Sequence, residues 1–138
     1  MTAAHQQVTS EWWSHRRSAF ELYASQFVVG EASAGDPEAA KLRLDALSEI
    51  PLLAPSDEAE ALAEELVKRG PVPERAVTDA AHIALAATHG MDYLVTWNCT
   101  HIANAEMRVD IERICRTRGF EPPVLCTPEE LMGEDHGP

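Results

Sequence analysis

The chain has 138 residues, 45% of them hydrophobic and 25% charged, a mixture typical of one globular domain with a core of its own. No apolar run approaches the roughly 20 residues of a membrane-spanning helix, and residues 1–10 contain no apolar stretch like that of a signal peptide. We therefore expect a cytoplasmic protein with no membrane partner. The formal net charge of −12 argues against a module that reads DNA by bulk attraction, because such modules are basic where they touch nucleic acid.

Helical patterns alternate with short apolar runs along the chain, which predicts a mixed α/β domain. Thr9 or Ser10 is expected to cap a first helix that runs through the aromatic residues Trp12, Trp13 and Phe20. These aromatics are expected to be core residues, with an interface between two copies of the chain as the alternative.

Three further helices are predicted to start at polar residues that can cap a first turn, Ser25, Asp36 and Ser56. The residue after Asp36 is a proline, which favours the first helical position. The helix after Ser56 carries an apolar stripe at helical spacing. Its members are Ala59, Leu62, Ala63 and Leu66.

Two later helices are predicted over residues 73–87 and 105–118, and each is followed by a glycine that can end it. Four short apolar runs are predicted as strands. They cover residues 22–24, 51–55, 93–96 and 124–126. After the last run, Thr127 and Glu130 have the spacing of a capping box. Residues 132–138 are expected to form a frayed tail to a single domain over residues 1–138.

Two carboxylates lie where packing alone would not place them. Asp79 shares a helix face with Ile83, and Glu31 falls beside Phe27 in the same way. A charge among apolar neighbours is costly unless it is paired or bound to a metal. Either acid alone is explained as well by a position at the rim of its stripe, near solvent or an arginine such as Arg75. Two such acids on separate helices predict a shared metal site.

Polar residues near these acids are further candidates for the site. Asn98 follows the run at 93–96, and ligands of parallel sheets gather at the carboxyl ends of strands. It can orient a metal-bound water, or it can simply cap the next turn. His82 and His101 are candidates for lining a substrate groove, although a structural role fits both histidines as well.

The cysteines and arginines give less specific signals. Cys99, Cys115 and Cys126 follow no zinc or redox spacing, so reduced thiols are expected. Four arginines near one another could hold a phosphate group, or they could form a solvated helix face. They are Arg108, Arg113, Arg116 and Arg118.

Several of these segments resemble PIN domains, a family that includes the small metal-dependent ribonucleases acting as toxins in toxin–antitoxin pairs. Residues 25–31 resemble the segment that carries the second acid of that family. Residues 79–98 resemble its third-acid helix with the strand and polar position that follow, and residues 127–131 resemble the ending of one subgroup. The likeness covers about residues 9–131. It implies a PIN-like three-layer domain, in which helices flank a short parallel sheet.

The resemblance also implies an activity. Carboxylates of PIN domains bind Mg²⁺ or Mn²⁺, and a metal-activated water attacks an RNA phosphodiester. Glu31 and Asp79 would be the metal ligands, with Asn98 holding a metal-bound water or the phosphate. His82 and His101 would line the groove. RNA, an antitoxin protein and a second copy of the chain are the partners that the resemblance suggests.

The chain departs from the family at two positions. PIN domains begin with a strand that ends in the first acid, whereas here no apolar strand precedes the first helix and no acid precedes Glu11. The fourth acidic position is the amide Asn98. A catalytically inactive PIN-like binding or assembly module is therefore the alternative. A scaffold or antitoxin-like domain unrelated to PIN is a third reading, expected if Glu31 and Asp79 lie on opposite faces.

Overall fold

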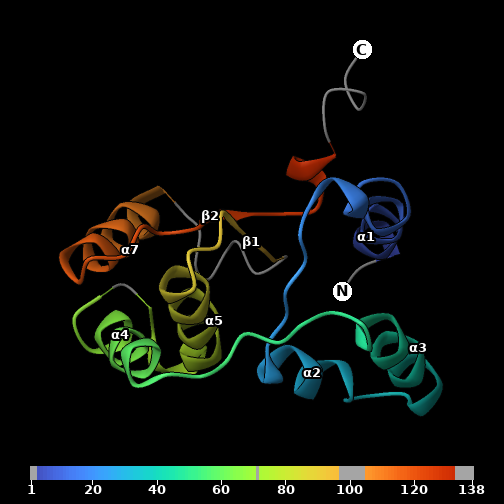
Figure 1. The fold of residues 1–138 in the computed structure, drawn as a ribbon, viewed down its shortest axis with the longest axis horizontal. Helices are drawn as coiled ribbons and strands as arrows, with labels where there is room; N and C mark the ends of the chain where they lie inside the picture. Colours follow the sequence, from blue (N-terminus) through green and yellow to red (C-terminus); the bar gives the residue numbers. More distant parts are fainter. Residues whose placement is uncertain (1–2, 71, 97–104, 133–138) are drawn as a thin grey trace.

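The computed structural model describes residues 3–70, 72–96 and 105–132. The fold is mixed α/β, mostly helical with a small parallel sheet, in agreement with the predicted class (Figure 1). Its helices are α1 (Ala3–His15), α2 (Gln26–Ala32), α3 (Pro37–Leu47), α4 (Asp57–Lys68), α5 (Val77–Thr88) and α7 (Ala105–Thr117). Its strands are β1 (Tyr93–Val95) and β2 (Val124–Cys126), and its short 3₁₀ turns are η1 (Arg17–Ala19), η2 (Glu74–Ala76) and η3 (Glu129–Leu131).

The predicted starts of α2, α3 and α4 are confirmed. The side chains of Ser25, Asp36 and Ser56 each accept a hydrogen bond from the backbone N–H three residues further on, at 3.2, 3.0 and 3.1 Å. Arg43 of α3 donates hydrogen bonds to the carbonyl groups of Ala32 and Ala34, at the end of α2. Because these bonds satisfy carbonyls that a helix end leaves open, they hold α2 and α3 together as a pair.

The first and fifth helices begin at residues other than those predicted. Helix α1 starts at Ala3, so Thr9 and Ser10 lie inside it instead of capping it, and Phe20 lies beyond its end. The polar and alanine residues before Thr9 favour a helix enough to extend it upstream. The predicted helix over residues 73–87 is divided, because Ala76 has φ −109° and ψ 30° and separates turn η2 from α5.

Two of the four predicted strands pair as a ladder. Strands β1 and β2 are parallel, with Leu94 opposite Leu125. The other two predictions, residues 22–24 and 51–55, are wrong as strands, since these runs meet in a single parallel bridge between Ala24 and Leu52. Prolines bracket the second run and have no N–H to donate, which limits a longer ladder there.

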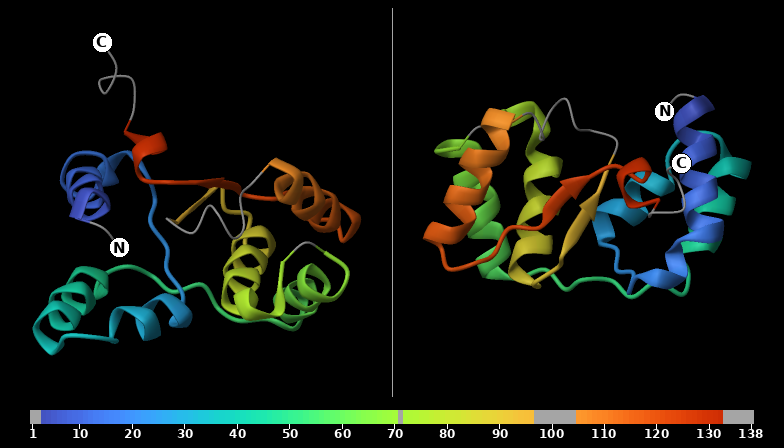
Figure 2. Two further views of the ribbon diagram at one scale, coloured as in Figure 1. Left: turned by 180° about the vertical axis from the view of Figure 1, so that it is seen from behind. Right: turned by 90° about the horizontal axis from the view of Figure 1, so that it is seen from above.

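The core lies where α4, α5 and α7 pack together. Leu62, Leu66 and Ile83 are fully buried in it, and alanines along α5 let the neighbouring helices approach closely. Burial raises the pKa of the Cys115 thiol, also in this core, to about 11, so the group stays neutral near pH 7. Figure 2 shows the strands between this group of helices and a second group made of α1, α2 and α3.

Three other predictions concern the capping box after β2, the C-terminal tail and membrane-spanning helices. The capping box is confirmed: the N–H of Thr127 donates to the Glu130 carboxylate at 3.1 Å, and the N–H of Glu130 donates to the Thr127 hydroxyl at 3.3 Å. Most of the expected tail, residues 133–138, lies outside the described residues. Across the described ranges, none of the helices has the length and apolar character needed to cross a bilayer.

Two glycines with opposite surroundings give a test of this packing. An added Cβ at Gly30, inside α2, meets nothing within 4 Å, so Gly30→Ala is expected to raise the free energy of unfolding by about 0.5–1 kcal/mol. At Gly70 the same Cβ would lie 2.6 Å from both the Leu66 carbonyl oxygen and Ile114 Cδ1, so Gly70→Ala should lower it by about 1–3 kcal/mol. Urea denaturation followed by circular dichroism measures the free energy of unfolding of both variants. Equal changes in the two would contradict the different surroundings of Gly30 and Gly70.

Candidate functional site

A hydrogen bond between α2 and α5 links two of the predicted site residues. The Glu31 carboxylate oxygen Oε1 lies 3.1 Å from Nε2 of His82, across 51 positions of sequence. Glu31 is the one acid of α2, and its side chain is 63% exposed, whereas the His82 side chain is 15% exposed. The exposed carboxylate therefore reaches back to a mostly buried imidazole.

The imidazole of His82 is held from two directions by α2. The ring of Phe27 meets it edge-on, with 6.0 Å between ring centroids and 84° between planes. The Glu31 carboxylate accepts from Nε2 when that nitrogen carries the proton, and Nδ1 of the neutral ring is then an acceptor. The ring contact with Phe27 and the hydrogen bond to Glu31 together fix the orientation of the His82 imidazole.

Asp79 lies on the same helix, three residues before His82, and its side chain is partly buried. Residues three apart share a helix face, so the Glu31 contact lies on the face of α5 that also carries Asp79. The third reading, in which the two acids lie far apart on opposite faces of a domain unrelated to PIN, stays a hypothesis that this contact does not test. The link through His82 is what the sequence interpretation missed, since His82 entered it only as a groove residue.

The described residues do not form a complete metal site. In the ranges that the structure covers, no three His, Cys, Asp or Glu side chains gather closely enough to hold an ion. The carboxylates of Glu31 and Asp79 still suit Mg²⁺. Proteins often bind this ion through one or two carboxylates, and waters and substrate phosphate complete its coordination shell. Two predicted members of the site, Asn98 and His101, lie outside the described residues.

Three of the four predicted arginines, Arg113, Arg116 and Arg118, pair with nearby acids. Arg113 donates to Asp110 at 2.8 Å, and Arg118 lies 2.9 Å from Glu65 of α4. The hydrogen bond from Arg118 holds the pKa of the Glu65 carboxyl below its usual value. Arg116 lies 3.7 Å from an acid on its own helix. The pairs of Arg113 and Arg116 are exposed and that of Arg118 is partly buried, and all three fit a solvated helix face better than a phosphate-binding cluster.

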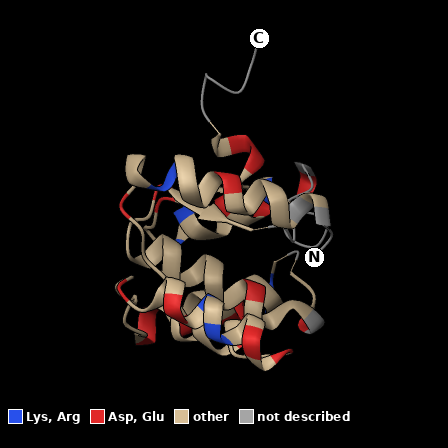
Figure 3. Cartoon of the chain, turned by 90° about the vertical axis from the view of Figure 1, so that its right-hand side faces the viewer, with Lys and Arg blue, Asp and Glu red and all other residues tan. Residues whose placement is uncertain are grey.

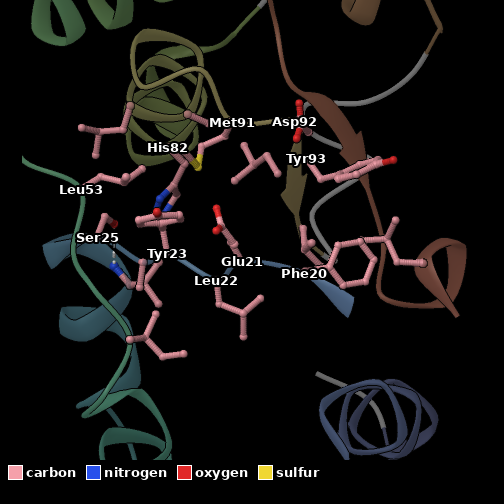
Figure 4. Close-up of a pocket in the computed structure, with 18 of the residues that line it drawn as sticks. Phe20, Glu21, Leu22, Tyr23, Ser25, Leu53, His82, Met91, Asp92 and Tyr93 are labelled. Atoms are coloured by element: carbon pink, nitrogen blue, oxygen red, sulfur yellow. Dashed lines mark hydrogen bonds between the residues drawn. The ribbon is translucent and has the colours of Figure 1, made fainter. Parts of the chain in front are cut away.

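A cavity of about 660 Å³ lies beside the Glu31–His82 pair, and His82 forms part of its wall (Figure 4). Helices α1, α2 and α5 and strand β1 all contribute to its lining, which is largely apolar. Glu21 and Asp92 are its carboxylates, and no Lys or Arg occurs among the described lining residues. The excess of acids, 23 against 11 basic residues, is spread over several elements in the side view of Figure 3.

Comparison with known proteins finds no family model that matches the chain and no similar curated protein or solved structure. The likeness to PIN domains therefore depends on the residue patterns of the chain itself. The geometry that bears on it is the contact between Glu31 and His82 on the helix that carries Asp79.

Proposed function

We propose that this chain is a PIN-type, Mg²⁺- or Mn²⁺-dependent ribonuclease, with Glu31 and Asp79 as its metal ligands. The observation that carries the proposal is the 3.1 Å hydrogen bond from His82 to Glu31, which brings the acid of α2 to the helix that carries Asp79. A PIN-like sheet, a cytoplasmic location, RNA as substrate and restraint by an antitoxin protein belong to the same proposal, because the resemblance implies them together.

Four residues have distinct roles in the proposed site. His82 engages one oxygen of the Glu31 carboxylate. The second oxygen would hold the ion, and Asp79, one turn earlier on α5, would supply a further oxygen. A bound Mg²⁺ or Mn²⁺ would polarise the RNA phosphate and lower the pKa of a water. Phe27 packs on His82 and keeps the histidine directed at Glu31, so it acts as a positioning residue.

Metal binding tests the proposal directly. Titration calorimetry with Mn²⁺ is expected to show a saturable site on the purified chain, weakened at least about tenfold by Glu31→Gln because a charged ligand is lost. Glu38→Gln, which neutralises an exposed acid in the first turn of α3, is the matched control and should leave binding unchanged. Equal loss in both variants would point to general charge effects.

The activity itself is measured as cleavage of a structured RNA in the presence of Mn²⁺ or Mg²⁺. Cleavage is expected to stop when EDTA removes the metal, and it should be weaker in Glu31→Gln than in Glu38→Gln. RNA cleavage that continues with the metal chelated would refute the proposed mechanism.

A second candidate function is a catalytically inactive binding or assembly module. It is favoured by the finding that no three potential ligands gather among the described residues. A chain that folds, gives no heat with Mn²⁺ and cleaves no RNA would support this module over the nuclease.

A further inference from the structure

Two stretches of the chain, one of which contains strand β1, contribute most of the cavity lining. Residues 19–25 line it without interruption on one side, and residues 90–95, which include β1, line it on the other. Ala24 on the first stretch pairs outward with Leu52, and β1 pairs outward with β2. The cavity therefore separates two short parallel pairings, which the described residues do not join into one sheet.

Among the residues that the structure describes, no strand pairs with the backbone edges that face the cavity. Ala24 exchanges hydrogen bonds with Pro51 and Leu53, at 2.9 and 2.8 Å, and Leu94 faces β2. Alternate residues of a strand direct their N–H and C=O groups to opposite sides. The N–H and C=O groups of Tyr23, Tyr93 and Val95 therefore point away from these partners, and among the described residues they make no backbone hydrogen bond outside the β1–β2 ladder.

The side chains at these edges are unusually apolar for their exposure. Tyr23, Tyr93 and Val95 are 45%, 46% and 38% exposed, and all three line the cavity. Open apolar strand edges are normally covered, because they are templates for pairing with another strand. The cavity wall also includes Trp12, whose buried indole N–H has no hydrogen-bond partner among the described residues.

We infer that the cavity binds an extended segment of a partner polypeptide, which inserts as a strand between residues 22–24 and β1. Such a strand satisfies both open edges at once and joins the two pairings into a single sheet, the recognition mode known as β-strand addition. This inference does not depend on the proposed nuclease activity.

The surroundings specify the chemistry of the inserted segment. Helices border the cavity from α5 on one side and from α1 and α2 on the other, so the segment should be apolar on both faces, like a buried parallel strand. A run of five residues spans about 17 Å and matches the stretch from 21 to 25. Because Glu21 and Asp92 are the charged lining residues, and Figure 4 shows Glu21 between Tyr23 and Tyr93, basic residues should flank that run.

The test uses one defined probe, the fluorescein-labelled and amidated peptide Lys-Val-Ile-Val-Ile-Val-Lys. Fluorescence anisotropy is expected to show saturable binding to the full chain. Replacing the central valine of the peptide by proline removes an N–H needed for pairing and should weaken binding at least about tenfold. Exchanging both lysines for glutamates should weaken it too. Equal binding of the valine and proline peptides would overturn the inference.

Amide hydrogen exchange locates the peptide. The N–H groups of Tyr23, Tyr93 and Val95 should become protected when it binds. Val95→Lys, which puts a cation into the cavity, should weaken binding about tenfold or more, whereas Val124→Lys on β2, an exposed valine outside the cavity lining, should not. Protection of the same amides without peptide, rising with protein concentration together with a dimeric mass, would assign the cavity to a second copy and overturn the inference.

Discussion

Leu66→Ala is expected to lower the free energy of unfolding by about 2–5 kcal/mol, the range measured when a buried leucine is truncated. Leu66 lies on α4 and is fully buried in the core cluster that joins α4, α5 and α7. Removing three carbons there costs both the transfer free energy of the side chain and the contacts around the cavity left behind. The effect should be large because alanines already form much of the facing surface of α5 and offer little that can collapse inward.

A leucine on another helix provides the matched control. Leu42 of α3 is 72% exposed, so Leu42→Ala should change the free energy of unfolding by no more than about 0.5 kcal/mol. Urea denaturation of both variants, with the slope of the transition compared to that of the parent chain, measures the difference. Similar losses in the two variants would mean that α4 is not the packed helix described above.

The sequence predicted those parts of the fold that local chemistry determines. The caps Ser25, Asp36 and Ser56 act on backbone groups three residues away, so each can be identified within one turn of sequence. The buried face of α4 follows from the spacing of its own apolar residues. Where the pattern had no such local determinant, as at the start of α1, the predicted boundary was displaced by several residues.

Pairing between distant segments was harder to predict. The runs at 22–24 and 93–96 look alike in composition, yet only the second enters a ladder, because a strand depends on what lies beside it. The runs at 22–24 and 51–55 meet at one bridge and leave the cavity edge open. A short stretch of sequence does not show which other strand, if any, lies beside it in the fold.

The same contrast between local and long-range features applies to the candidate site. Glu31 and Asp79 could each be proposed as site residues from the sequence, because a carboxylate with apolar neighbours at helical spacing stands out within one turn. The contact between Glu31 and His82 could not, since it depends on how α2 packs against α5 across 51 residues. The one feature of the sequence that points to the Glu31–His82 contact is the position of His82 three residues after Asp79, on the same face of the helix.

Asp79→Asn is expected to reduce metal-dependent RNA cleavage by at least about 100-fold, if Asp79 is a ligand as proposed. Asparagine has nearly the shape of aspartate and keeps one carbonyl oxygen, so the partly buried position on α5 should stay packed. What is lost is the negative charge, which a divalent cation needs when only two protein carboxylates are available to it. Initial rates at saturating Mn²⁺, together with a Mn²⁺ titration, separate weaker metal binding from a slower reaction.

Glu74→Gln is the control for this substitution, because Glu74 is an exposed acid on the turn just before α5. It removes the same charge within a few residues of Asp79 but should leave both the rate and the Mn²⁺ requirement unchanged. Circular dichroism must show that Asp79→Asn retains the parent fold, since an unfolded variant would lose activity for a different reason. A folded Asp79→Asn chain that cleaves RNA at the parent rate would exclude Asp79 as a metal ligand, while leaving the peptide-binding cavity unaffected.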